Sequence, residues 1–161
     1  MRIGVVSDTH NHLRNVVRIV ELFNASGVER VIHTGDITQA KTLEVFARLE
    51  APLVGVYGNN DLERPSLAAA AERCDFGLVD GPLELRWANR SILVVHDPLD
   101  IAPAQRSEHS VVLHGHDHRY VLERVNGCLV FNPGECAGHM AGHNAIGVLD
   151  LETLEVERLL F

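Results

Sequence analysis

The chain has 161 residues, 46% of them apolar, and a formal net charge of −8 with neutral histidines. This size and composition are ordinary for a soluble globular protein, and we expect residues 1–161 to form a single domain. The negative charge argues against stable or non-specific nucleic-acid binding, which depends on lysine and arginine side chains that meet phosphates.

The first half of the chain alternates between predicted strands and predicted helices. Continuous apolar runs predict strands buried on both faces, and apolar residues at helical spacing predict the helices between them. The predicted strands are Arg2–Ser7, Arg30–His33 and Leu53–Gly58; the predicted helices run from Leu13 to a stop at Gly27, over Ala40–Glu50 and over Pro65–Cys74. This alternation predicts a mostly parallel sheet covered by helices, with right-handed crossovers.

The second half consists of short strand-like runs with few helical stretches between them. The runs cover residues 82–87, 90–96, 110–115, 119–125, 128–132, 145–151 and 154–161. Val125–Gly127 and Asp150–Thr153 have the composition of hairpin turns. These features predict a second, mostly antiparallel sheet packed on the first, with helices outside, in an α/β fold.

Polar side chains follow five of the predicted strands at the points where the strands end. They are Asp8, His10, Asp36, Asn59, Asp61, His96, His114, His116 and His118. In open α/β sheets, ligands bind in the crevice at the carboxyl ends of the strands. Carboxylate, imidazole and amide oxygen together suit borderline divalent ions such as Mn, Fe, Co, Ni or Zn. The set is too large for one four-coordinate ion and sufficient for two ions that share a carboxylate.

Taken singly, each of these motifs has an ordinary structural explanation. An aspartate before a helix is a common cap, "TGD" and "GNND" are turn sequences, and a lone His96 after a strand is more often a satisfied polar group than a ligand. "GHDH" is more specific, because alternate positions on an extended chain place His116 and His118 on the same side. The five motifs in this order favour one metal centre.

The ordered motifs "SDTH", "GD", "GNND", "VVH", "GHDH" and "NPGE" resemble those of the calcineurin-like metallophosphoesterases. Within that superfamily the chain is similar to the small single-domain phosphodiesterases of bacteria and archaea. The resemblance covers Ile3 to about Glu135 by motif. It implies a four-layer αββα sandwich of two mixed β-sheets flanked by helices, which agrees with the two-sheet prediction.

The resemblance also implies a set of metal ligands. One divalent ion would bind Asp8, His10, Asp36 and His118, and the other would bind Asp36, Asn59, His96 and His116. The expected ions are Mn²⁺ first, with Ni²⁺, Fe²⁺, Zn²⁺ or Co²⁺ as alternatives. A hydroxide that bridges the ions would attack phosphorus in line, and Asp36, Asn59 and His116 would lie at the catalytic centre. His114 is not a ligand in the family pattern.

Three positions depart from the family pattern. Asn60 stands where many members have a histidine that protonates the leaving group, which puts hydrolysis of poor leaving groups in doubt. Asp97 replaces the usual glycine after His96, and Glu135 replaces the serine of the last motif. We expect these two acids to reshape the pocket or to select among phosphate substrates.

Other polar residues near the motifs have less specific interpretations. Asp61 is expected to orient a ligand as a hydrogen-bond acceptor, against the alternative of a plain turn residue. Asn11 could contact substrate phosphate, as could His12, although surface loop residues are the simpler interpretation. His139 and His143 lie in a glycine-rich segment that we interpret as a loop near the rim of the site.

The predicted substrate is a small phosphodiester or nucleotide-type molecule. No run reaches the ~18 consecutive apolar residues of a membrane span, and Cys74, Cys128 and Cys136 lack metal-type spacing, which fits reduced thiols in the cytoplasm. The sequence leaves a homo-oligomer open. It also leaves two alternatives to catalysis: a protein-interaction scaffold on the same fold, like the retromer subunit that resembles these enzymes, and a metal-stabilised domain without activity.

Overall fold

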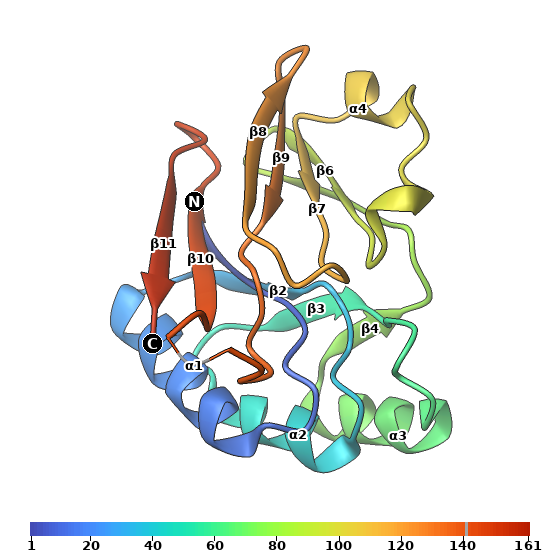
Figure 1. The fold of residues 1–161 in the computed structure, drawn as a ribbon, viewed down its shortest axis with the longest axis vertical. Coiled ribbons are helices and arrows are strands. Elements are labelled where there is room, and N and C mark those ends of the chain that lie inside the picture. The colour runs from blue at the N-terminus through green and yellow to red at the C-terminus, as the bar shows by residue number, and fades with distance from the viewer. Residues whose placement is uncertain (141) are drawn as a thin grey trace.

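Two β-sheets packed face to face form the centre of the computed structural model, which describes residues 1–140 and 142–161 (Figure 1). Three helices cover the outer side of the larger sheet, and the two sheets enclose an apolar core between them. The fold is therefore the predicted α/β sandwich of two mixed sheets.

The larger sheet has six strands in the order β11-β10-β1-β2-β3-β4. Its four parallel strands are β1 (Arg2–Val6), β2 (Arg30–His33), β3 (Leu53–Val56) and β4 (Gly77–Val79), and its antiparallel strands are β10 (Ala145–Asp150) and β11 (Val156–Leu160). The expectation of a mostly parallel sheet is confirmed for β1 to β4, four of the six strands. Strand β4 has only three residues, which are not fully buried, and its sequence carried no clear signal.

The helices of this sheet are α1 (Leu13–Ser26), α2 (Ala40–Val45) and α3 (Arg64–Cys74). Helix α1 ends at Gly27, whose left-handed backbone (φ 61°) forms the predicted stop. The predicted helix over Ala40–Glu50 is shorter than expected, because α2 tightens into the 3₁₀ turn η1 (Phe46–Arg48). That turn keeps Phe46 buried against α1 and β2.

The smaller sheet has five strands in the order β5-β6-β7-β9-β8. They are β5 (Leu83–Trp87), β6 (Arg90–Val94), β7 (Val111–Leu113), β8 (Val121–Val125) and β9 (Cys128–Asn132). The prediction of a mostly antiparallel second sheet is wrong, because β6, β7 and β9 run parallel and only the outer pairs are antiparallel. The last two predicted strands, β10 and β11, join the larger sheet instead. Strand β10 is buried along most of its length, which suits a position between β11 and β1.

The outer face of the smaller sheet has a thin cover. Leu93, Val112 and Val130 point to this face and pack with Ile101. Ile101 belongs to the segment that carries η2 (Pro98–Asp100) and α4 (Gln105–Glu108), two short helices that the sequence did not predict. This segment forms the fourth layer of the sandwich.

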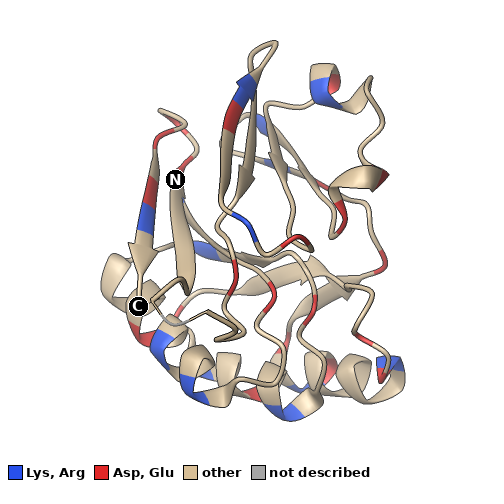
Figure 2. Ribbon diagram, viewed as in Figure 1, with Lys and Arg blue, Asp and Glu red and all other residues tan. Residues whose placement is uncertain are grey.

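The loops that follow β1, β2, β3, β6 and β7 meet at one edge of the sandwich. The backbone N–H of Asp8 donates to the carbonyl of Gly35, and that of Gly115 donates to the carbonyl of His96, so neighbouring loops are linked to each other within each sheet. Acidic residues gather in these central loops (Figure 2). Among the described residues, no helix has the length and apolar character of a membrane span. Within the same residues, all three cysteines are free.

Candidate metal centre

Five of the seven predicted ligands have a backbone in the left-handed region. Their φ values are 50° at Asp8, 44° at His10, 60° at Asp36, 72° at His116 and 54° at His118. Residues with a side chain rarely adopt this conformation, and such strain is concentrated at functional sites. The loops turn sharply directly after the strands, and the turns bring the side chains together at this edge of the sandwich.

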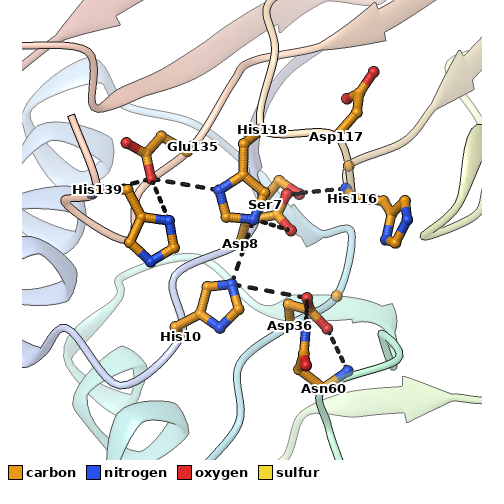
Figure 3. Close-up of polar contacts among 12 residues, drawn as sticks. Ser7, Asp8, His10, Asp36, Asn60, His116, Asp117, His118, Glu135 and His139 are labelled. Atoms are coloured by element: carbon orange, nitrogen blue, oxygen red, sulfur yellow. Dashed lines mark hydrogen bonds and ion pairs between the residues drawn. The ribbon is translucent and has the colours of Figure 1, made fainter.

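The first cluster of donor atoms lies around Asp8 (Figure 3). Nε2 of His10 lies 3.4 Å from Nε2 of His118, and the latter atom lies 3.4 Å from Oδ1 of Asp8. Nε2 of His10 also lies 3.8 Å from Oδ2 of Asp36. The structure thus brings together the four residues predicted for one ion.

The second cluster lies on the other side of Asp36. Nε2 of His96 lies 3.5 Å from Oδ2 of Asp36 and 2.9 Å from Oδ1 of Asn59. Nδ1 of His116 lies 3.0 Å from the same Asn59 oxygen and 3.3 Å from Nε2 of His96. Oδ2 of Asp36 therefore faces both clusters, as a bridging carboxylate would.

The donor set fits divalent ions. Ligand atoms about 2.1 Å from a tetrahedral ion lie about 3.4 Å apart, and the separations between imidazole nitrogens and carboxylate oxygens here are close to that value. Oδ1 of Asp8 is buried and has no hydrogen-bond partner in the described part of the chain. Burial of a carboxylate oxygen without a donor is unfavourable, and a bound cation at this position would compensate for it. Asp8, His10 and His118 form one candidate metal-binding group, and Asp8, Asp36 and His96 form another.

The environment of Asp36 keeps its side chain ionised. Burial raises the pKa of Asp36, but hydrogen bonds from His96 and Asn60 outweigh burial and hold the pKa well below its usual range. Conversely, burial lowers the pKa of His96, but the Asp36 carboxylate outweighs burial and leaves the pKa above its ordinary value. Nδ1 of His96 lies 2.9 Å from the carbonyl of Thr34, which orients the ring so that Nε2 faces the cluster.

Asp8 is held by a close approach of the two sheets. Its Oδ2 accepts hydrogen bonds from the hydroxyl of Ser7 and from the backbone N–H of His116. A Cβ atom at Gly115 would collide with Oγ of Ser7 and lie 2.7 Å from Oδ2 of Asp8, so only glycine fits there. Burial raises the pKa of Asp8, because desolvation disfavours the ionised carboxylate.

Asp61 lies behind the centre. Its buried carboxylate accepts hydrogen bonds from the backbone N–H groups of Asp36, Ile37, Thr38 and Gly58, at 3.0, 2.8, 2.6 and 2.7 Å. It therefore fastens the loop after β2 to the loop after β3.

Asn60, Asp97 and Asn11 lie around the clusters. The backbone N–H and the side-chain amide of Asn60 donate to the two oxygens of Asp36, at 2.8 and 2.7 Å. Oδ2 of Asp97 lies 3.6 Å from Nε2 of His116, and Asn11 lines a cavity beside His10. These positions border the clusters without joining them.

Histidines outside the motifs have different surroundings. His114 is buried, with Nδ1 3.2 Å from the carbonyl of Gly115. His12 accepts a hydrogen bond from the backbone N–H of Asn15 and so caps α1, and His143 is exposed. His12 therefore has a helix-capping contact of its own.

Glu135 and His139 border the first cluster more closely than the sequence indicated. Oε2 of Glu135 lies 3.4 Å from Nδ1 of His118 and 3.5 Å from Nδ1 of His139. The rings of His118 and His139 are stacked, with centroids 5.2 Å apart and an interplanar angle of 4°. The local sequence carried no signal for this contact, because Glu135 and His139 lie in an irregular segment where a spacing of four residues implies no contact.

The family model described as a calcineurin-like phosphoesterase superfamily domain matches residues 1–154. The chain belongs to this superfamily. It is 35% identical over 165 residues to the phosphodiesterase MJ0936 of Methanocaldococcus jannaschii, with 99% of each chain covered. It is 26% identical over 178 residues to the phosphodiesterase YfcE of Escherichia coli K12, covering 97% of this chain and 91% of that one.

Solved structures agree with this membership of the calcineurin-like phosphoesterases. A structure described as a novel archaeal phosphodiesterase superposes with a TM-score of 0.90 at 33% identity, and all of both chains is covered. A Vps29 of Entamoeba histolytica superposes with a TM-score of 0.70 at 18% identity, covering 100% of this chain and 99% of that one. The second likeness shows a shared fold alone.

Proposed function

We propose that this calcineurin-like phosphoesterase is a phosphodiesterase that uses two divalent metal ions. The observation that carries the proposal is the position of Oδ2 of Asp36, which lies 3.8 Å from Nε2 of His10 and 3.5 Å from Nε2 of His96. One carboxylate oxygen thus lies close to both clusters of candidate ligand atoms. The relatives named as phosphodiesterases support the reaction class.

We assign seven side chains as ligands. Asp8, His10, Asp36 and His118 would hold one ion, and Asp36, Asn59, His96 and His116 would hold the other. Mn²⁺ is the ion we expect first, and Ni²⁺, Fe²⁺, Zn²⁺ and Co²⁺ suit the same donors. Two dications with the two carboxylates leave a charge of about +2, which attracts a phosphate despite the chain's net charge of −8.

Bound ions would supply an activated water nucleophile and charge stabilisation for in-line displacement at phosphorus. The protein's own groups prepare that chemistry. Asp36 stays ionised because His96 and Asn60 donate to it, and the Thr34 carbonyl fixes the ring of His96. Asn60 has no titratable proton, and its nitrogens already donate to Asp36. The site therefore favours leaving groups that depart without protonation.

We infer that residues 1–161 form one domain that works in the cytoplasm on small phosphodiesters. The complete set of seven donors favours catalysis over a scaffold role, because a scaffold has no need of strained, converging imidazoles.

The experiment is hydrolysis of bis(p-nitrophenyl) phosphate and p-nitrophenyl phosphate after removal and readdition of metal. Manganese, nickel, zinc and magnesium are added back separately to the chelated protein. We expect metal-dependent turnover that favours the diester and is lost in His116→Ala. The exposed His143→Ala serves as the matched control and retains turnover. A folded protein that binds two ions and hydrolyses neither ester would overturn the proposal.

A further inference from the structure

A cavity of about 340 Å³ opens directly beside the candidate metal centre. His10 and Asn60 form its wall on the side of the metal centre, while Thr38, Gln39 and Leu62 form other parts of its lining. Pockets that hold small molecules begin at about 300 Å³, so the space suits one arm of a small ester. A substrate whose phosphate lies at the metal centre would extend one arm into this cavity.

Two residues of this lining each carry a buried polar atom without a partner in the described part of the chain. Oγ1 of Thr38 and Oε1 of Gln39 are buried atoms that make no hydrogen bond within the described part of the chain. Buried polar atoms in native proteins are nearly always paired, and an unpaired atom calls for a ligand or water. Both atoms belong to adjacent residues that line the same cavity, so a ligand there would pair with both once the two side chains rotate toward it.

Thr38 is also held in a strained conformation. Its φ is 70°, which is unfavourable for a β-branched residue. The backbone N–H of Thr38 donates to Oδ1 of Asp61 at 2.6 Å, so the buried carboxylate keeps the residue in this conformation. Strain that the surroundings maintain is typical of ligand-binding positions.

The chemistry of the lining selects the kind of arm. Asn11, Gln39 and Asn60 contribute amides, Thr38 contributes a hydroxyl, and Leu62, with 83% of its surface exposed, offers an apolar face. Among the described residues that line the cavity, there is no lysine or arginine, and Glu63 adds a negative charge. Such a lining suits an uncharged group with hydrogen-bonding edges and repels a second phosphate.

We propose that this cavity binds one ester arm of the substrate, that the arm is an uncharged hydrogen-bonding group such as a nucleoside, and that Thr38 and Gln39 contact it. The inference rests on the proposed phosphodiesterase function. It makes the preferred substrate a nucleoside phosphodiester with a single phosphate, and it makes Thr38 and Gln39 specificity residues.

The test compares three p-nitrophenyl diesters that share a leaving group and differ in the other arm. The arms are methyl, thymidine 5′-yl, and thymidine 5′-yl with a 3′-phosphate. We expect kcat/KM of the thymidyl ester to exceed that of the methyl ester by about tenfold, as one or two new hydrogen bonds would give. We expect the added 3′-phosphate to lower kcat/KM, and Glu63→Gln to reduce that loss.

Variants of the cavity lining test the binding of the ester arm separately from the chemistry at the metal centre. Thr38→Val and Gln39→Met remove the unpaired polar atoms at similar volume, and each should bring the thymidyl-to-methyl ratio toward one. Thr38→Ser keeps the hydroxyl and should keep the ratio. Ser107→Ala, on the exposed surface of α4, is the control that leaves the ratio unchanged.

A binding measurement supplements the kinetics. Thymidine added to the protein should shift the side-chain amide resonance of Gln39 in the nuclear magnetic resonance spectrum. Equal kcat/KM for the methyl and thymidyl esters, or a higher value for the 3′-phosphorylated ester, would overturn the inference and leave the phosphodiesterase standing. Failure to hydrolyse all three esters with any metal would instead count against the proposed function.

Discussion

The buried carboxylate of Asp61 accepts a 3.0 Å hydrogen bond from the backbone N–H of Asp36, the residue that faces both donor clusters. Three further backbone N–H groups donate to the same carboxylate. Asp36 has a strained backbone (φ 60°), and Asp61 supplies the interactions that hold it there. The geometry of the candidate metal centre thus depends on a side chain that does not face the donor clusters.

We expect Asp61→Asn to lower the free energy of unfolding by about 2–3 kcal/mol. An amide has the same shape, but its NH₂ group would face backbone N–H groups that donate to a carboxylate oxygen in the wild type. Those N–H groups would lose their acceptor. Urea denaturation followed by circular dichroism measures the change. Asp80→Asn is the control: Asp80 is exposed and forms a surface ion pair with Arg64, so its loss should cost under about 0.5 kcal/mol. Equal decreases in the free energy of unfolding in the two variants would show that the hydrogen bonds of Asp61 stabilise the fold no more than an exposed ion pair does.

Local sequence patterns predicted the elements well. Arg30–His33 forms β2 as expected, and Val125 pairs with Cys128 across the predicted turn, where Asn126 and Gly127 have positive φ. Both cases depend on short-range physics: a continuous apolar run is buried, and an Asn-Gly pair adopts the left-handed conformations of a two-residue hairpin. The polar residues that follow the strands could be placed at one edge, because the carboxyl ends of parallel strands lie at the same edge of a sheet.

Long-range pairing was the part that the sequence did not determine. Strand β10 has the composition of any buried strand, and nothing local indicates that its partners are β1 and β11. The hydrogen bonds of Asn60 to Asp36 and the contact of Glu135 with His118 likewise depend on how distant loops meet. Composition shows which side chains can bind a metal, but only the fold shows which ones support the ligands.

We predict that the stability of the metal-free protein falls with decreasing pH because of His33. The ring is fully buried: Nδ1 accepts from the N–H of Gly35, Nε2 lies 3.0 Å from Oγ1 of Thr9, and burial lowers the pKa of His33 from 6.5 to about 3. Below pH 6.5 the unfolded chain therefore binds a proton that the folded chain does not. The free energy of unfolding should fall by about 1.4 kcal/mol per pH unit between about pH 6 and 4 from this residue.

Urea denaturation between pH 4 and 7.5 checks the pH prediction. His33→Gln should lower stability at pH 7.5 and should flatten the slope below pH 6.5 relative to the wild type. His143→Gln removes an exposed imidazole and should leave the slope as it is. An unchanged slope in His33→Gln would assign the acid sensitivity to other groups.

We predict that the two ions can be lost separately. His118 lies in the cluster with Asp8 and His10, whereas His116 lies in the cluster with His96 and Asn59. His118→Ala and His116→Ala should therefore each bind about one ion per chain with micromolar free Mn²⁺, against two in the wild type. Metal content after gel filtration gives the stoichiometry. Two tightly bound ions in either variant would refute the ligand assignment, whatever the activity.

The last prediction concerns the contact of Glu135 with Nδ1 of His118. Burial raises the pKa of Glu135, but hydrogen bonds from the backbone N–H groups of Met140 and His139 outweigh burial and lower it, so the side chain is a carboxylate. A carboxylate on one ring nitrogen fixes the tautomer and makes the other nitrogen a stronger ligand. Glu135→Gln should therefore weaken metal binding at the first cluster about tenfold, measured by competition with a chelator.

Two comparisons make the Glu135 result specific. The exposed Glu123→Gln on β8 changes the net charge equally and should leave metal affinity unchanged. The double variant Glu135→Gln with His116→Ala retains only the first cluster. It should bind its single ion about tenfold more weakly than His116→Ala alone does. If the single variant Glu135→Gln weakens metal binding at the second cluster instead, the carboxylate acts through the electric field of the whole site and does not position His118.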